Sequence, residues 1–265
     1  MYIPHFSPDE FRAPTGHYRL ARARDGDILY AYIRKNSSTA FKQFINRRPH
    51  PRYLLKTLLG IEKFPKMHLK GNMRYSKVPS TGNIETIGCN TAIFVYRDPA
   101  ERLVSAFMNK FIDDDGSMDI KSNYSRVMGK EPEDATFRDF IAYAALGFAE
   151  IDVHLHPQKA HLWDIPYQPI PMGHLKEALS VMLPKKTVER YFGRKHNSSD
   201  ANARNTFEGA LVDMPAKILQ AEKAKGNTFA KCNFLTEETR ASVSRLYWQD
   251  YQMIEEIGDS LALVV

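Results

Sequence analysis

Two short apolar runs stand out in the hydrophobic pattern of this chain, and each is followed by a polar turn and an amphipathic stretch. The first run, residues 28–33, is almost continuous in aliphatic and aromatic side chains, which predicts a strand buried on both faces. The second run, residues 91–96, has the same character. Residues 39–46 then read as a helix after the first run. Each run therefore predicts a strand that leads through a short turn into a helix.

The second of these helices carries a strong start signal. Asp98 is suited to the N-cap, Pro99 to the first helical position, and Glu101 to the third position of a capping box. One helical stripe holds the apolar residues that we expect to pack on the core: Leu103, Val104, Phe107, Met108 and Phe111.

Weaker patterns continue the alternation of strands and helices. Helices are predicted over residues 137–146, capped by Thr136, and over residues 174–182 and 237–257. Residues 165–172 contain three prolines, which restricts this segment to an edge strand or a short central one.

This alternation predicts an α/β fold with a central, mainly parallel sheet flanked by helices on both sides. No linker or change of composition divides the chain, so we expect a single domain over residues 1–265. Within it we assign residues 1–26 to an N-terminal extension.

The balance of charges favours an anionic partner without naming one. The 37 lysines and arginines exceed the 31 acidic residues, for a formal net charge of +6. We find neither the apolar core of a signal peptide nor a window near the roughly 20 apolar residues of a membrane span. We therefore expect a cytoplasmic protein without a transmembrane segment. Cys89 and Cys232 lack CxxC spacing, so we expect reduced thiols.

The first polar turn combines Lys35 with the short side chains of Asn36, Ser37, Ser38 and Thr39. Backbone N–H groups at the start of a helix attract phosphate, and lysine and hydroxyl side chains add donors. A Walker A loop needs glycines and this turn has none, which disfavours an ordinary ATP- or GTP-hydrolysing P-loop. The alternative is an N-capped helix whose hydroxyl groups satisfy only their own backbone.

In the second turn, Arg97 stands at the carboxyl end of a predicted strand, where open α/β sheets bind their ligands. Its guanidinium can bind a phosphate through two hydrogen bonds, and Ser105 lies farther along the same helix. Arg102 is the weaker candidate because exposed helix arginines are usually only solvated. The alternative for Arg97 is an ion pair with a carboxylate such as Asp98. Two such turns suggest a ligand with anionic groups at both ends of a nucleotide.

These turns resemble motifs of the carbohydrate sulfotransferases, a family of Golgi enzymes with bacterial relatives that use 3′-phosphoadenosine 5′-phosphosulfate (PAPS). Residues 97–107 are similar to the family's R-[DE]-P-x-x-R-L-x-S-x-[FY] segment. Lys35 and Thr39 fit its P-K-x-x-x-T-like loop, with Arg34 in place of the proline. The chain thus looks like a soluble, bacterial-like member of this family.

Two further segments extend the resemblance. Residues 152–158 are similar to the family's [DN]-x-H-W-x-P-Q segment, with Leu155 in place of the tryptophan. Residues 196–199 are similar to its H-x-N-S/T element, one residue shorter between the histidine and the asparagine. The resemblance spans roughly residues 27–258.

The resemblance implies a P-loop-NTPase-like sulfotransferase fold and in-line transfer of a sulfuryl group from PAPS to a hydroxyl group. Lys35 would stabilise the leaving oxygen, because negative charge builds up there during transfer. No step requires a metal. The residues implied for cofactor binding are Lys35, Asn36, Ser37, Ser38 and Thr39 at the 5′ end, Arg97 and Ser105 at the 3′-phosphate, and Asn197.

A general base must take the proton of the acceptor, and histidine is suited to this near neutral pH. Family relatives tend to place the base between the two PAPS motifs, which points to His68. His154 is the rival, because it lies in a family-like segment. A metal cluster of His154, His156 and His161 fits no zinc template, so we expect no metal site.

Two other functions compete with a sulfotransferase. A phosphotransferase with a degenerate P-loop would need the missing glycines and an acidic Mg²⁺-binding motif. A nucleic-acid-binding protein could use the basic residues between 47 and 77, but no recognised nucleic-acid motif accompanies them. We therefore expect a saccharide or another small molecule as the acceptor, and no nucleic-acid partner.

Overall fold

The computed structural model describes residues 17–23, 26–45, 89–113, 118–147, 149–162, 166–193, 207 and 209–262. The chain divides into two compact units, which we describe separately. The sheet unit comes from residues 16–96 and 161–196, and the helical unit comes from residues 1–15, 97–160 and 197–265.

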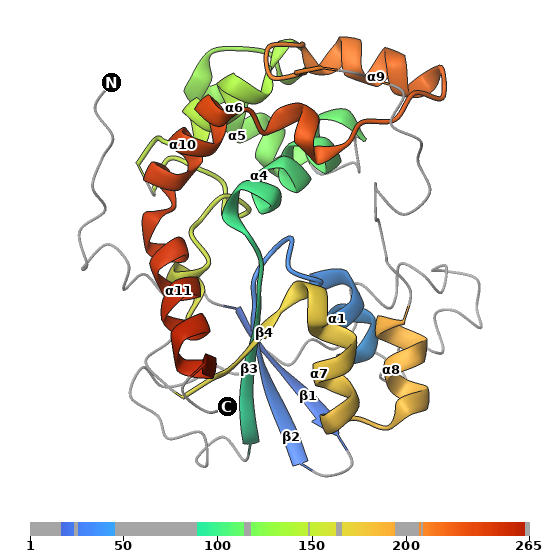
Figure 1. Cartoon of the computed structure of the whole chain (residues 1–265). Coiled ribbons are helices and arrows are strands. Elements are labelled where there is room, and N and C mark those ends of the chain that lie inside the picture. Colours follow the sequence, from blue (N-terminus) through green and yellow to red (C-terminus); the bar gives the residue numbers. More distant parts are fainter. Residues whose placement is uncertain are drawn as a thin grey trace. The chain divides into compact units, whose positions relative to one another are not determined.

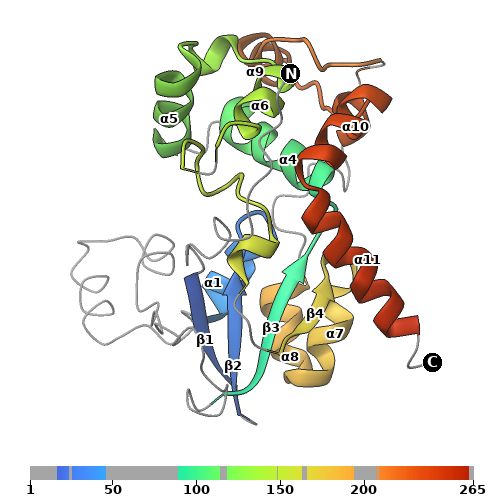
Figure 2. The same cartoon turned by 90° about the vertical axis from the view of Figure 1, so that its left-hand side faces the viewer.

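The sheet unit is built on a four-stranded sheet in the order β1-β2-β3-β4, which Figure 2 shows. Its strands are β1 (His17–Ala23), β2 (Gly26–Tyr32), β3 (Cys89–Tyr96) and β4 (Gln168–Pro171). Strand β1 is antiparallel to β2, whereas β2, β3 and β4 are mutually parallel neighbours. The predicted α/β fold with a mainly parallel sheet is therefore confirmed.

Both edge strands differ from the rest of the sheet in sequence. Strand β1 pairs with β2 from His17 opposite Tyr32 to Ala23 opposite Gly26, within the segment that we assigned to an N-terminal extension. Its sequence alternates weakly and is rich in arginine, so no apolar pattern marks it as a strand. Strand β4 lies at the opposite edge, where its prolines are tolerated, as expected.

Three helices pack on one face of this sheet (Figure 1). They are α1 (Ser38–Ile45), α7 (Leu175–Met182) and α8 (Lys185–Phe192). Tyr30 of β2 stacks on Phe41 of α1 with ring centroids 3.8 Å apart, and Phe41 contacts Phe192 of α8. Leu29 and Ala31, which alternate with Tyr30, are also fully buried, so β2 is buried on both faces as predicted.

The helical unit is organised around an aromatic core. Phe107 lies within 6 Å, centroid to centroid, of Phe111, Phe137, Phe140 and Phe234. Its helices are α4 (Pro99–Phe107), α5 (Met118–Met128), α6 (Phe137–Ala144), α9 (Ala216–Ala224), α10 (Glu237–Leu246) and α11 (Trp248–Ala262). A π-helical turn, η3 (Met108–Ile112), continues α4, and the predicted apolar stripe of this segment is buried.

The predicted helix over residues 237–257 is divided into α10 and α11, which point in different directions in Figure 2. The break falls at Tyr247, whose φ of −107° and ψ of 31° leave the helical region. Its buried hydroxyl donates to the Leu155 carbonyl oxygen at 2.7 Å, so a tertiary contact accompanies the interruption. Among the helices that the structure describes, none has the length and apolar character needed to span a bilayer.

Candidate functional site

The turn after β2 adopts a backbone conformation that is usual for glycine although it contains none. Lys35 and Ser37 have φ angles of 69° and 56°, in the left-handed region that non-glycine residues enter only at an energetic cost. Strain of this kind persists where the surrounding structure fixes it, and it concentrates at ligand-binding sites. The lack of glycine therefore has not prevented a tight strand-to-helix turn.

Asn36 fixes this turn from within. It is fully buried, and its Nδ2 donates to the Val95 carbonyl oxygen of the neighbouring strand at 2.8 Å. Its own carbonyl oxygen accepts a hydrogen bond from the Tyr30 hydroxyl at 3.1 Å. The side chain of Asn36, which we predicted to bind the cofactor, thus supports the turn from the protein interior.

The other predicted residues of this turn lie nearer the surface. Lys35, Ser37 and Ser38 are partly buried and Thr39 is exposed. The Ser37 carbonyl oxygen accepts from the Phe41 N–H at 3.2 Å, so the first turn of α1 forms directly after the strained residues. N–H groups at such a helix start have no helical acceptor and can bind an anion.

The second turn begins α4 as the sequence predicts. Asp98 is the N-cap and its Oδ1 accepts from the Glu101 N–H at 2.8 Å, with Pro99 at the first helical position. Strands β2 and β3 are parallel neighbours, so their carboxyl ends, from which the two turns start, lie at one edge of the sheet.

The side chain of Gln158 forms hydrogen bonds with both the backbone N–H and the backbone carbonyl of Arg97. Its Oε1 accepts from the Arg97 N–H at 3.0 Å, and its Nε2 donates to the Arg97 carbonyl oxygen at 2.8 Å. The Asp250 carboxylate fixes Gln158 in turn, because it accepts from the Gln158 N–H at 2.8 Å and from the Lys159 N–H at 2.9 Å. Burial raises the pKa of the Asp250 carboxyl, while these donors and the charge of Arg102 act in the opposite direction.

The side chain of Arg97 is paired with Glu101. Its Nη2 lies 3.2 Å from Glu101 Oε2, and the same oxygen accepts from Lys231 Nζ at 3.1 Å. Asp98, which we considered as the partner of Arg97, instead caps α4 and accepts from the Tyr251 hydroxyl. Arg97 thus belongs to a cluster of two cations and one carboxylate.

Arg102 is not the solvated helix arginine that we expected. It is 2% exposed, and its Nη2 donates to the His154 carbonyl oxygen at 3.1 Å. A buried guanidinium close to Asp250 ties α4 to the segment 152–158. Arg102 therefore supports the site from the interior.

His154 is oriented by a carboxylate of its own segment. Its Nδ1 lies 2.5 Å from Asp152 Oδ1, and the same oxygen accepts from the His154 N–H at 2.8 Å. The backbone N–H of Asp152 donates to the Tyr143 hydroxyl at 2.9 Å, which fixes this segment against α6. A histidine held in this way can accept a proton, because the carboxylate stabilises the imidazolium that forms.

Of the other predicted site residues, the structure describes Ser105 but neither His68 nor Asn197. Ser105 lies on α4, partly buried, two turns after Arg97. His68 and Asn197 lie outside the described residues. Within the part of the chain that the structure describes, no group of three or more histidine, cysteine or acidic side chains is arranged to hold a metal ion.

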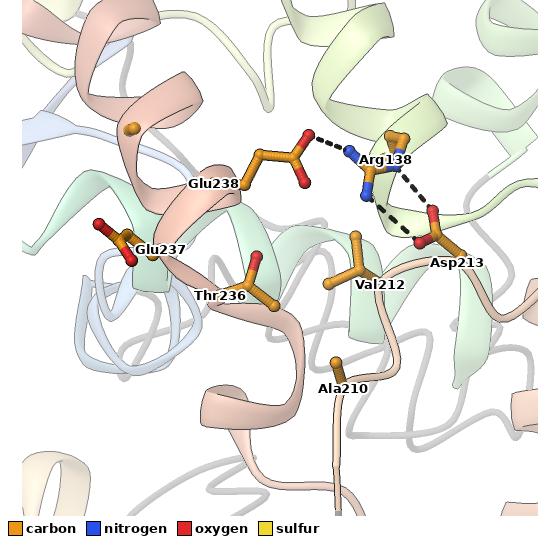
Figure 3. Close-up of a pocket in the computed structure, with 8 residues that line it drawn as sticks. Arg138, Ala210, Val212, Asp213, Thr236, Glu237 and Glu238 are labelled. Carbon is orange, nitrogen blue, oxygen red and sulfur yellow. Dashed lines mark hydrogen bonds and ion pairs between the residues drawn. The ribbon is translucent and has the colours of Figure 1, made fainter.

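A surface hollow of about 560 Å³ in the helical unit contains none of the predicted site residues. Figure 3 shows Arg138 at its rim, held by Asp213 and Glu238. Two carboxylates already neutralise this arginine, so the hollow does not offer a free cation to an anionic ligand. Its lining consists of Arg138, Ala210, Val212, Asp213, Thr236, Glu237, Glu238 and Ala241.

Sequence reasoning did not single out Gln158 and Lys231, which the structure places beside Arg97 and its partner Glu101. Gln158 ends a family-like segment, and this was a usable signal. Lys231 lies 130 positions after Glu101, with no motif around it, so only the folded chain reveals the contact.

Together, these features define an α/β protein with two polar turns that follow adjacent parallel strands. The family model described as the sulfotransferase family matches residues 18–254. The chain therefore belongs to the sulfotransferase family. Comparison with the curated proteins gave no match, and comparison with the solved structures gave none either.

Proposed function

We propose that this protein transfers the sulfuryl group of PAPS to a hydroxyl group of a carbohydrate or another small acceptor. The observation that carries the proposal is the position of Arg97, whose backbone is fixed by Gln158 and whose side chain is grouped with Lys231. Membership of the sulfotransferase family supports sulfuryl transfer as the chemistry. The donor set of cations, hydroxyl groups and helix N–H groups fits the two phosphate-bearing ends of PAPS.

The two turns receive different roles in this proposal. Lys35, Ser37, Ser38 and Thr39 bind the 5′-phosphosulfate, and the buried Asn36 keeps their backbone in place. The strained backbone at Lys35 and Ser37 is consistent with a loop preorganised for an anion.

The second turn binds the other end of the nucleotide. Arg97 and Ser105 bind the 3′-phosphate, which distinguishes PAPS from ordinary adenine nucleotides. Asn197 contributes to the same cofactor. Gln158 acts as a positioning residue because it contacts the backbone of Arg97.

The transfer itself requires one bond to form and one to break. The acceptor oxygen attacks the sulfur in line with the bond to the 5′-phosphate oxygen, which leaves as adenosine 3′,5′-bisphosphate. Lys35 stabilises the negative charge on this leaving oxygen. A histidine accepts the proton that the acceptor hydroxyl loses.

We favour His154 as this base, with His68 as the second candidate. The Asp152 carboxylate at 2.5 Å orients the ring of His154 and stabilises its protonated form. Because the backbone of His154 is tied to Arg102, the base is also linked to the helix that follows Arg97.

A thermal-shift comparison tests the proposed function against its alternatives. Adenosine 3′,5′-bisphosphate, ATP with Mg²⁺, and an oligonucleotide are each added at the same concentration, chosen to be about a hundredfold above the Kd of the bisphosphate. A ligand that binds only the folded state adds about 2.7 kcal/mol of stability at this excess. We expect a shift with the bisphosphate alone. A shift only with ATP and Mg²⁺, or only with the oligonucleotide, would refute the sulfotransferase assignment.

A further inference from the structure

A second cation lies beside Arg97 in the helical unit. Oε2 of Glu101 contacts Arg97 Nη2 at 3.2 Å and Lys231 Nζ at 3.1 Å. Since one oxygen contacts both nitrogens, these nitrogens are at most about 6.3 Å apart. Two donors at this separation can bind different oxygens of one phosphate group.

Lys231 is held in place by the fold. It opens a short 3₁₀ helix, η7 (Lys231–Phe234), which packs against α4. Asn233 Oδ1 accepts from the Ala230 N–H at 2.9 Å, and Phe234 is fully buried in the aromatic core. The backbone on either side of Lys231 is therefore anchored, and its side chain is only 23% exposed.

The cluster brings two like charges together with little solvent around them. The side chain of Arg97 is 10% exposed, whereas that of Glu101 is 44% exposed. Two cations this close need an anion nearby, because water screens their repulsion poorly. Burial raises the pKa of Glu101, but Lys231 and Arg97 outweigh this effect, so the pKa lies below its ordinary value and the group is charged at neutral pH.

We infer that Lys231 and Arg97 together bind the 3′-phosphate of the nucleotide, and that Glu101 occupies this cation pair until the phosphate displaces it. A phosphate group carries about −1.5 to −2 charges at neutral pH, against −1 for a carboxylate, so it is the stronger counter-ion. The exposure of Glu101 allows its side chain to turn into solvent. This inference rests on the proposed function and adds a residue and an internal competitor to it.

Calorimetric titration of Lys231→Met with two nucleotides tests the role of Lys231. Adenosine 3′,5′-bisphosphate carries the 3′-phosphate and adenosine 5′-phosphate lacks it. We expect Lys231→Met to weaken the bisphosphate about tenfold or more, as for loss of a charge-assisted hydrogen bond, and to leave the 5′-phosphate unchanged. Lys231→Arg keeps the charge and should keep the preference. If Lys231→Met lost the same factor of affinity for both nucleotides, the assignment would be overturned.

Lys217→Met is the matched control. Lys217 is also a lysine of the helical unit paired with a carboxylate, since its Nζ lies 2.6 Å from Asp134 Oδ1. This variant has the same change of charge but should bind both nucleotides like the wild type. If Lys217→Met lost as much affinity for the bisphosphate as Lys231→Met, the loss would arise from the change in net charge alone. This result would overturn the inference.

The variant Glu101→Gln tests whether the 3′-phosphate displaces the Glu101 carboxylate from Arg97 and Lys231. Removing the competing charge should tighten the binding of the bisphosphate severalfold and leave adenosine 5′-phosphate unaffected. Weaker or unchanged binding of the bisphosphate would show that Glu101 does not compete with the phosphate.

The wild type separates failure of this inference from failure of the proposed function. If the wild type shows no preference for the 3′-phosphorylated nucleotide, the proposed function itself fails. If the wild type prefers it and Arg97→Ala loses that preference while Lys231→Met keeps it, only the role of Lys231 is refuted.

Discussion

Two buried tyrosines of the helical unit differ in how their hydroxyl groups are satisfied. The Tyr143 hydroxyl donates to Asn123 Oδ1 and accepts from the Asp152 N–H. Tyr124 contacts Tyr143 edge to face, but among the described residues no group makes a hydrogen bond with its hydroxyl. A buried polar group without a partner costs stability, whereas a paired one contributes to it.

Removing the two hydroxyl groups should therefore have different effects. We expect Tyr124→Phe to be neutral or stabilising, within about 0.5 kcal/mol. Tyr143→Phe should lower the free energy of unfolding by about 1–3 kcal/mol, because it leaves the Asp152 N–H without its acceptor. Urea denaturation of both variants measures the difference. Equal destabilisation would contradict the hydrogen bonding described here.

The pair formed by His154 and Asp152 makes a second prediction at this scale. Once a screen with labelled PAPS has found an acceptor, His154→Ala should lower kcat about a hundredfold or more, as for loss of a general base. Asp152→Asn keeps the shape but not the charge, and should also lower kcat. The KM for PAPS should stay close to that of the wild type in both variants. Wild-type turnover in His154→Ala would exclude His154 and leave His68.

Single residues were also where sequence reasoning reached its limit. The chemistry of Arg97 could be predicted from its place after a strand, yet its partner is Glu101 rather than Asp98. Asn36 was predicted as a cofactor-binding residue, and its burial against Val95 could not be read from the sequence. The contact of Asn36 with Val95 is a tertiary one that no local pattern encodes, whereas Arg97 and Glu101 are only four positions apart and their pairing could have been considered from the sequence.

At the scale of elements, the start of α6 is fixed by a reciprocal capping box. Thr136 accepts from the Asp139 N–H, and the Asp139 carboxylate accepts from the Thr136 N–H at 2.8 Å and from Lys130 Nζ at 2.7 Å. Burial raises the pKa of Asp139, but Lys130 and Thr136 more than compensate, so the pKa lies below its ordinary value of 3.8.

This lowered pKa gives the capping box a defined pH dependence. A carboxyl group with a lower pKa in the folded state stabilises the protein above the unfolded-state pKa, and this contribution is lost as the pH falls through the folded-state pKa. Asp139→Asn should therefore cost about 1 kcal/mol at neutral pH. The difference from the wild type should shrink as the pH falls below 3.8. A difference that stays constant across this range, measured by urea denaturation, would contradict the assignment.

Elements with strong local signals could be predicted, and those defined by pairing could not. The helix after Asp98 begins where its capping residues indicate, because capping is a local interaction. Strand β1 has no comparable signal, since backbone pairing with β2 defines it. The division between α10 and α11 likewise coincides with the contact of Tyr247 with Leu155.

At the scale of the whole molecule, the topology of the sheet is consistent with membership of the sulfotransferase family. The parallel strands β2 and β3 lead into the two predicted anion-binding turns, and the sulfotransferase family model covers residues 18–254. The α/β class with a mainly parallel sheet was predictable because strands and helices alternate along the chain. The acceptor was not, because specificity in such folds depends on loops whose sequences carry no general signal.

The central claim is that the protein distinguishes a 3′-phosphorylated adenine nucleotide through Arg97. Calorimetric titration of the wild type and Arg97→Ala with adenosine 3′,5′-bisphosphate and adenosine 5′-phosphate tests it most directly. The wild type should bind the bisphosphate at least about tenfold more tightly, and Arg97→Ala should lose most of this preference. Equal affinities of the wild type for the two nucleotides, or an unchanged preference in Arg97→Ala, would contradict the claim.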